Sequence, residues 1–223
     1  MIKLKCCIYL LSGNYFNVSM FVFLSSIDHN LFWLINSHHS YFFDCFFSIV
    51  TYLGNGWVVA PVLLAIVVKK VPRKKLFPFI VCSTIFMVGS ALINTQIKQS
   101  INRPRPMAFF GNETNQIRLA QPRASQAPYA VHVVGERMCC NSFPSGHANT
   151  AFSAATLVAL RFGGVFWWAY LPAGIVGYSR IYMGAHFPSD VGAGALLGVV
   201  VLWIGLRMYY WFDRRGTVRH DKQ

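Results

Sequence analysis

The stretch from Ser179 to Asp190 places three side chains that can do chemistry at the mouth of an otherwise apolar hairpin: Arg180, His186 and Asp190. Charged side chains at the end of a membrane helix are costly to leave unpaired and are commonly functional. Two earlier stretches have the same character. Residues 144–147 (Pro-Ser-Gly-His) open another apolar run, and Lys98 precedes the pair Arg105-Pro106. We expect the three stretches to meet at one phosphate group.

Five residues are predicted to hold that phosphate: Lys98, Arg105, Ser145, Gly146 and Arg180. The three cations can neutralise the charge that builds on the phosphate oxygens, and arginine offers a planar fork that binds phosphate through two hydrogen bonds. Ser145 and Gly146 begin a predicted helix, where backbone N–H groups point at an anion. Glycine also lets the backbone approach the oxygens without a Cβ in the way.

Two histidines can divide the catalytic work. One imidazole must attack phosphorus in its neutral form, giving a phosphohistidine. We predict His186 for this role, because Asp190 follows four residues later and can fix the tautomer through one ring nitrogen. His147 is then left to protonate the departing alkoxide and to activate water. The motifs hold too few acidic residues for a metal site, so we expect no metal and no other cofactor.

Together the stretches read Lys-x6-Arg-Pro, Pro-Ser-Gly-His and Ser-Arg-x5-His-x3-Asp, beginning at Lys98, Pro144 and Ser179. This pattern resembles all three motifs of the type 2 phosphatidic acid phosphatase superfamily, over about residues 50–210. The resemblance implies a six-helix membrane bundle, metal-independent hydrolysis and a phosphohistidine at His186. It also implies the second histidine as general acid and the same five-residue phosphate cradle.

One ambiguity concerns the first motif, because Arg103-Pro104 offers a second Arg-Pro pair. The spacing from Lys98 selects Arg105. The family also includes soluble acid phosphatases and vanadium haloperoxidases, and the membrane spans argue against both. Two other functions stay open: a lipid phosphotransferase that uses the same phosphohistidine, and a non-catalytic protein that binds lipid.

The composition indicates an all-α, polytopic membrane protein with one domain. Of 223 residues, 55% are hydrophobic and 12% are charged, whereas about 25% are charged in an average soluble domain. We expect six transmembrane helices, or five if the first does not span. These lie at about residues 6–24, 54–68, 76–97, 148–160, 165–179 and 188–211.

Residues 1–50 are predicted to hold the first span and an interfacial helix, residues 51–212 the catalytic bundle, and residues 213–223 a basic cytoplasmic tail. The stretch 28–50 mixes aromatic with polar residues, which is typical of an amphipathic helix lying in the outer interface. His38 and His39 in this stretch are expected to be solvated.

The charge balance sets the orientation. Twenty Lys and Arg against seven Asp and Glu would suggest nucleic acid in a soluble chain. In a membrane protein it is better read by the positive-inside rule. A cytoplasmic cluster at residues 69–75 puts most basic residues inside and the three motifs outside. We therefore expect the site to face the periplasm or outside. The size and the single domain suggest a bacterial inner-membrane protein, with the bilayer and a lipid phosphate as partners, no nucleic acid and no obligatory protein partner.

The candidate substrates are lipid A, undecaprenyl pyrophosphate, phosphatidylglycerophosphate and phosphatidic acid. The connection at residues 98–143 is longer than phosphate binding needs. Arg118, Arg123 and Arg137 in it could meet further phosphates or could be solvated loop charges, and both interpretations stay open. The cysteines also leave two interpretations open. Cys45 could form a disulfide bridge with Cys139 or Cys140, or all three could be free thiols.

Overall fold

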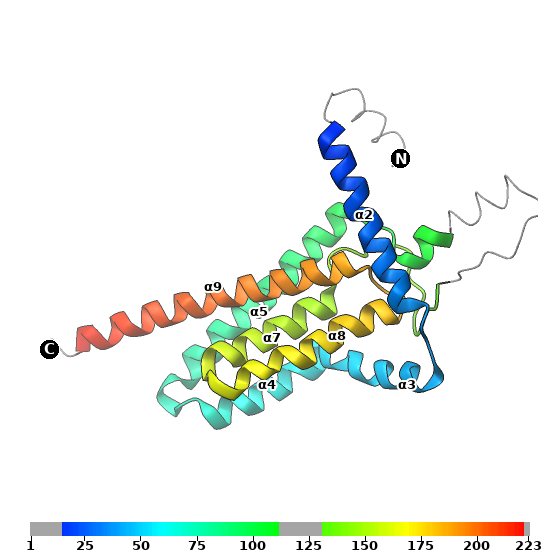
Figure 1. Cartoon of the computed structure of the whole chain (residues 1–223). Helices are drawn as coiled ribbons and strands as arrows, with labels where there is room; N and C mark the ends of the chain where they lie inside the picture. The colour runs from blue at the N-terminus through cyan, green and yellow to red at the C-terminus, as the bar shows by residue number, and fades with distance from the viewer. Residues whose placement is uncertain (1–14, 112–130, 221–223) are drawn as a thin grey trace, which may run out of the picture.

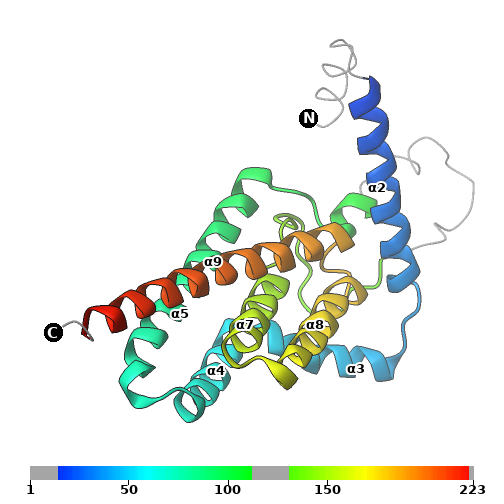
Figure 2. The ribbon, with the colours of Figure 1, turned by 60° about the vertical axis from the view of Figure 1, so that its left-hand side comes forward.

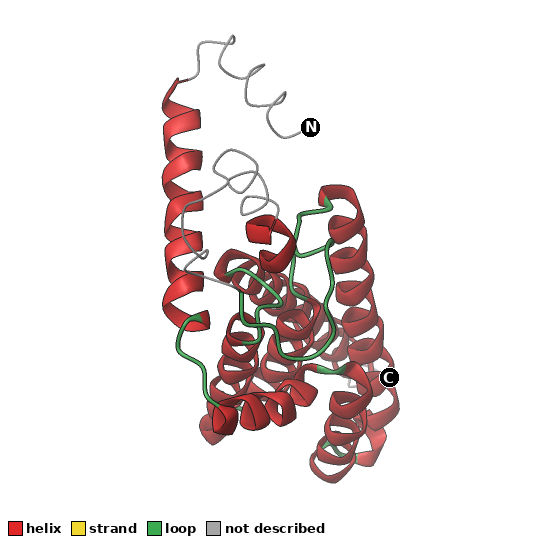
Figure 3. Ribbon diagram, turned by 90° about the vertical axis from the view of Figure 1, so that its right-hand side faces the viewer, coloured by secondary structure: helices red, strands yellow, loops and turns green. Residues whose placement is uncertain are grey.

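The computed structural model describes residues 15–111 and 131–220, and side chains within residues 24–111 and 131–214. All regular elements in these ranges are helices, and no strand occurs there (Figure 3). The all-α prediction is confirmed for this part of the chain. The elements are α2 (Tyr15–Asn36), α3 (Tyr41–Val50), η1 (Thr51–Gly54), α4 (Gly56–Lys70), α5 (Arg73–Ile101), a short helix at 106–111, α7 (Gly146–Phe162), η2 (Gly164–Ala169), α8 (Tyr170–Tyr182) and α9 (Pro188–His220).

Helix α7 is the centre of the bundle, and it packs against α4, α5, α8 and α9. Figures 1 and 2 show these helices running side by side, while α2 leans away from them. The main hydrophobic core lies between α4, α5, α7 and α9, where Phe79, Leu157 and Leu202 are almost fully buried. The sequence of α7 is rich in alanine, and these small side chains let the neighbouring helices come close.

Two glycines of α9 set the distance between α9 and α7. A Cβ on Gly194 would lie 2.3 Å from the carbonyl oxygen of Ser145, and one on Gly198 would lie 2.5 Å from that of Asn149. Only glycine permits such an approach of two backbones. A Cβ on Gly192, in the same helix, would meet nothing within 4 Å. The close contact between α7 and α9 therefore requires glycine at two positions, which lie on the same face of α9.

Two helices of the described chain are long and apolar enough to cross a membrane, within Arg73–Gly111 and Pro188–Arg214. The pair Tyr41–Gly54 and Gly56–Lys70 passes the same test together but is bent by 62°. Helices α7 and α8, with 17 and 13 residues, fall below the length of a full span. The protein is thus an integral membrane protein, but the count of six spans is not confirmed.

The N-terminal region differs from the predicted pattern. Helix α2 continues through residues 24–28 to Asn36, and the helix expected over 28–50 is interrupted at residues 37–40. The prediction of one continuous helix there was wrong, because a new helix begins after residue 40. Ser40 is the N-cap of α3, and its Oγ accepts a hydrogen bond from Phe43 N–H. Residues 6–14 of the expected first span lie outside the described residues.

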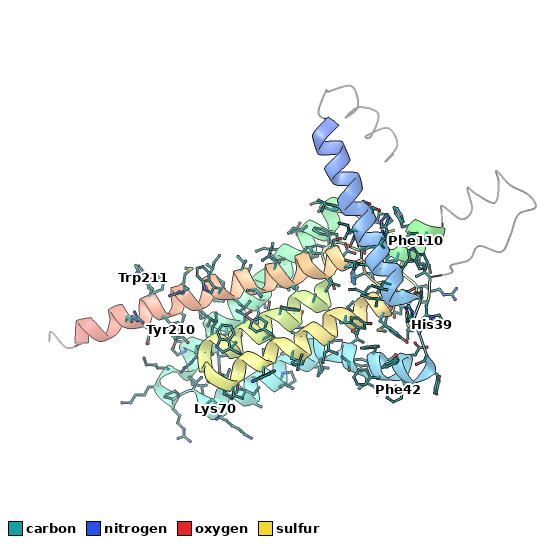
Figure 4. The ribbon with its side chains drawn as sticks, viewed as in Figure 1. His39, Phe42, Lys70, Phe110, Tyr210 and Trp211 are labelled. Atoms are coloured by element: carbon teal, nitrogen blue, oxygen red, sulfur yellow. The ribbon has the colours of Figure 1, made fainter. Side chains whose placement is uncertain are left out.

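The bundle has two chemically different ends. Figure 4 places Lys70 at one end and Phe110, His39 and Phe42 at the other. At the basic end, Lys75 Nζ pairs with Asp213 Oδ2 at 2.6 Å. His38 and His39 are exposed, as expected, and the His39 ring stacks on another imidazole at 4.0 Å.

Candidate active site

The three sequence motifs meet at the end of the bundle opposite the basic loop. Lys98 lies in the last turn of α5, His147 in the first turn of α7, Arg180 in the last turn of α8 and Asp190 in the first turn of α9. Figure 1 shows these four helix ends on the same side of the molecule. Their charges interact: Lys98 with Arg105, Arg180 and Asp190, and His147 with the three cations and with His186.

Two arginines of the predicted cradle are held by neutral acceptors. Arg105 is 8% exposed, and it donates through Nε to the Cys140 carbonyl at 3.0 Å and through Nη1 to the Ala185 carbonyl at 3.2 Å. Arg180 Nη1 donates to Thr51 Oγ1 at 2.8 Å, while its buried Nε has no partner among the described residues. Because no carboxylate of the described chain pairs directly with these guanidinium groups, their remaining N–H donors suit an anion.

The start of α7 supplies further donors, with one correction to the prediction. The backbone N–H of Ser145 donates to the Asp190 carbonyl at 2.9 Å, so it joins α7 to α9 and is not available for phosphate. The helical ladder begins with Asn149 N–H donating to the Ser145 carbonyl at 3.0 Å. The N–H groups of residues 146–148 therefore lack acceptors within the helix. The Ser145 hydroxyl is buried and without a partner in the described chain, so it remains a donor.

His186 is buried and neutral. It is 2% exposed and lies in the turn between α8 and α9, outside both helices. Burial, reinforced by the charges of Arg105 and Arg180, lowers the pKa of its imidazole to about 4, and Asp190 only partly opposes this. A neutral imidazole at physiological pH has a free lone pair, which a nucleophile requires.

Ser142 connects His186 to Asp190 and was not singled out from the sequence. The Asp190 Oδ2 atom lies 3.7 Å from His186 Nδ1, longer than a hydrogen bond. The Ser142 hydroxyl donates to the same Oδ2 and lies 3.5 Å from Nδ1. The Ser142 proton is already donated to Asp190. Toward His186 the Ser142 oxygen can therefore act only as an acceptor, which requires a proton on Nδ1. This arrangement favours the tautomer in which Nε2 is unprotonated.

Arg103 is the second arginine that sequence reasoning set aside. It does not replace Arg105, and both side chains belong to the site. Arg103 Nη1 donates to Asp190 Oδ1 at 2.6 Å, and its Nη2 donates to Asp28 Oδ2 at 2.8 Å. Asp28 lies in α2, and its side chain is only 8% exposed. The sequence held one signal that could have identified Asp28: it is a lone acidic residue within an apolar helix, where an ionisable side chain is commonly functional.

Gly184 shapes the turn that carries His186. Its φ is +69°, and a Cβ there would lie 2.4 Å from the His132 carbonyl oxygen. The His132 carbonyl also accepts from the Asn36 side chain at 2.8 Å, which ties the turn to the end of α2. The turn therefore requires a glycine at this position, although the spacing of the motif residues leaves it unspecified.

The cysteines and the arginines of the long connection complete the residues singled out from the sequence. Cys45, Cys139 and Cys140 are free, so the structure has no bridge from Cys45. Arg137 is exposed, whereas Arg118 and Arg123 lie outside the described residues. Within residues 24–111 and 131–214, no three His, Cys, Asp or Glu side chains are grouped so as to hold a metal ion.

Comparison with known proteins agrees with this arrangement. Residues 78–214 match the family model of the PAP2 superfamily. The chain is 28% identical to a lipid A 4'-phosphatase of Bacteroides thetaiotaomicron over 206 residues, which are 90% of this chain and 83% of the relative. It is 29% identical to an undecaprenyl-diphosphatase of Sulfolobus acidocaldarius, over 46% of this chain and 50% of the relative.

Two solved structures share the fold. The crystal structure of Aquifex aeolicus LpxE matches with a TM-score of 0.59 and 30% identity, covering 80% of this chain and 93% of that chain. A transmembrane PAP2-type phosphatidylglycerolphosphate phosphatase from Bacillus subtilis matches with a TM-score of 0.61 and 20% identity, covering 89% and 96%.

Proposed function

Because this chain belongs to the PAP2 superfamily and is a membrane-integral hydrolase of phosphate esters, we propose that it removes phosphate from lipid A without a metal, through a phosphohistidine at His186. The observation that carries the proposal is the neutral, buried imidazole of His186 beside arginines that no carboxylate of the described chain pairs with directly. Lipid A is placed first because the relative that aligns over 83% of its own length is a lipid A 4'-phosphatase.

In the first step, His186 Nε2 attacks phosphorus and the bond from phosphorus to the lipid oxygen breaks. His147 gives a proton to the departing alkoxide. Burial and the neighbouring cations lower the pKa of its imidazole to about 3, so His147 takes up this proton only when the negative charge of the bound phosphate offsets those cations. Lys98, Arg105 and Arg180 offset the charge that develops on the three equatorial oxygens, and the N–H groups at the start of α7 donate to them. The positive charge on the phosphorylated imidazole is stabilised by Asp190 through Ser142 and Nδ1.

In the second step, His147, now neutral, takes a proton from water as the water oxygen attacks phosphorus. The P–N bond breaks, its electron pair returns to Nε2 of His186, and inorganic phosphate leaves. The proton that His147 loses in the first step is restored from water in the second, and His186 regains its lone pair, so the enzyme is regenerated.

The proposed location is the extracytoplasmic leaflet of a bacterial inner membrane. The basic residues between α4 and α5 lie at the end of the bundle away from the site, which supports a cytoplasmic position for that end by the positive-inside rule. A substrate held in the bilayer would then reach the site sideways, with its phosphate at the level of the helix ends.

Phosphate release tests the proposal. The detergent-purified protein in EDTA is given lipid A, undecaprenyl pyrophosphate, phosphatidylglycerophosphate or phosphatidic acid, with His186→Ala as the control. We expect lipid A to be preferred and His186→Ala to be folded and inactive. Preference for another lipid would overturn the substrate, and normal turnover by His186→Ala would overturn the mechanism. Phosphate transfer to an added acceptor lipid, with no release to water, would instead indicate a phosphotransferase.

A further inference from the structure

We propose that Asp28 and Arg103 are positioning residues for catalysis, so that helix α2 is part of the catalytic apparatus. The inference rests on the proposed role of His186 as nucleophile. Arg103 is two residues from the cradle arginine, and Asp28 lies 50 residues before the start of the family match at residue 78.

Arg103 bridges two carboxylates with one planar group. Its Nη1 lies 2.6 Å from Asp190 Oδ1 and its Nη2 lies 2.8 Å from Asp28 Oδ2. The guanidinium carbon lies 4.3 Å from the centre of the Phe187 ring, which limits its movement on one side. Lysine cannot make this contact, because an ammonium group is a compact charge without the fork geometry.

Asp28 also holds the first turn of α9. Its Oδ1 accepts from Ser189 N–H at 2.7 Å, and its Oδ2 accepts from the Ser189 hydroxyl at 2.6 Å. The carboxylate therefore sits at the N-terminus of the helix, where negative charge is favourable. Ser189 is the residue immediately before Asp190. One side chain of α2 thus fixes both the backbone beside Asp190 and the arginine that binds it.

The contacts give the two oxygens of Asp190 separate partners. Oδ1 receives Arg103, while Oδ2 receives the Ser142 hydroxyl and the Phe187 N–H, the latter at 2.9 Å. The rotation of this fully buried carboxylate is thereby fixed. Because Ser142 is held by Oδ2 and faces His186 Nδ1, the arginine acts on the imidazole through two intermediates. Arg103 is therefore assigned as a positioning residue and not as a catalytic one.

A purely structural anchor for α2 would not need this arrangement. Helix α2 already packs against α8 and α9. Phe32 of α2 is completely buried against Phe187, and Asn36 bonds to two backbone carbonyls. Burying a carboxylate in addition is costly unless it is paired. The pairing found here is with the arginine that orients Asp190, which connects α2 to the catalytic group.

The first experiment compares Arg103→Gln, Asp28→Asn and the double variant on the lipid that the wild type hydrolyses fastest. Mutation of the partners that orient the histidine ligands of metals typically costs about 10–100-fold, and we use the same range for a histidine oriented through Asp190. We expect kcat to fall by that factor in Arg103→Gln and by about 10-fold in Asp28→Asn, with KM within about 2-fold of wild type. The double variant should lose less activity than the product of the two single losses, because Asp28 acts partly through Arg103 and partly through Ser189.

Calorimetric titration with orthovanadate gives a readout that does not depend on the lipid. Vanadate takes the place of phosphorus and bonds to the nucleophilic nitrogen, so its affinity should fall in both single variants. In Arg103→Ala, millimolar methylguanidinium should restore part of kcat, which a loosened fold would not show. Asp213→Asn, which removes the charge from the half-buried pair with Lys75 at the basic end, is the matched control and should keep wild-type kcat.

Wild-type kcat and vanadate affinity in Arg103→Gln would overturn the inference, as would multiplicative effects in the double variant. Asp28→Asn is isosteric and keeps the test possible if substitution of Arg103 prevents folding. The proposed function fails separately: active His186→Ala would refute the nucleophile, whereas inactive His186→Ala with normal Arg103→Gln and Asp28→Asn would refute only the positioning role.

Discussion

Substitution of Gly194 by alanine tests whether the distance between α7 and α9 sets catalytic geometry. The added Cβ would lie 2.3 Å from the Ser145 carbonyl oxygen, and real Cβ contacts are essentially never shorter than 3.0 Å. The two helix ends must therefore separate by about 0.7 Å, the difference between these distances. A side-chain rotation cannot relieve the clash, because the atoms that the new Cβ would meet belong to the Ser145 backbone.

The separation acts directly on the site. Helix α7 carries His147 in its first turn and α9 carries Asp190 in its first turn. The hydrogen bond from Ser145 N–H to the Asp190 carbonyl, now 2.9 Å, joins the same two ends and would lengthen. A misplacement of about 1 Å can cost about 100-fold in rate, so we expect kcat to fall by about 10–100-fold. Overpacking should also cost about 1–3 kcal/mol of stability.

The assay compares phosphate release and thermal unfolding in the same detergent. A loss of 1–3 kcal/mol from a typical total of about 5–15 kcal/mol leaves almost all molecules folded. Unfolding therefore cannot account for a 10-fold loss of activity. Gly192→Ala is the control on the same helix, because a Cβ there meets nothing within 4 Å. Alanine is the better helix former by about 1 kcal/mol, so this variant should be as stable as wild type or more so, and fully active. Wild-type kcat in Gly194→Ala would refute the reasoning.

Three further outcomes follow from the site. Vanadate should inhibit at micromolar concentration and EDTA should not; loss of activity in EDTA would require a metal. Arg180→Lys should lower kcat/KM by about 10–100-fold in steady-state kinetics, since a charge-assisted hydrogen bond contributes about 1.5–3 kcal/mol. Lysine lacks the planar fork that can bind Thr51 through one nitrogen and phosphate through another. For His186, the unfolded pKa of 6.5 exceeds the folded pKa of about 4. The unfolded chain thus binds the extra proton, and stability should fall as pH drops from 6.5 to 4. Melting temperatures should therefore fall more steeply for wild type than for His186→Asn over that range, and parallel curves would contradict the shift.

The sequence was sufficient to predict the groups at the helix ends. Lys98, Arg105, His147, Arg180 and Asp190 each lie where an apolar run begins or stops, and helices that cross one layer alternate in direction. Charged residues at the ends of such runs therefore gather on one side. The prediction needed only the order of the runs, and no knowledge of how the helices pack.

The helix boundaries near the N-terminus could not be obtained in the same way. The polar stretch at residues 25–30 (Ser-Ser-Ile-Asp-His-Asn) interrupts the apolar run, so hydropathy predicts a stop near residue 24, whereas α2 continues to Asn36. The break at residues 37–40 depends on Asn36, whose side chain bonds to the backbone at His132 and Tyr182, which lie 96 and 146 residues further along the chain. Such contacts exist only after the chain has folded. The number of full spans is open for another reason, because α7 and α8, with 17 and 13 residues, are shorter than a full span.

Charge balance shows what the assignment of Arg103 adds. The motifs alone supply Lys98, Arg105 and Arg180 as cations, with Asp190 as an anion. Including the pair from α2, the described site holds four cations and two carboxylates, and the histidine that we assign as nucleophile is neutral. Arg103 is occupied by the two carboxylates, so the cradle keeps its three cations for the ligand, and the site as a whole carries an excess of two positive charges. A phosphate monoester brings two negative charges. The charge of the buried Asp28 offsets that of Arg103, so the pair from α2 and the first motif leaves the excess of two positive charges unchanged and matched to that ligand.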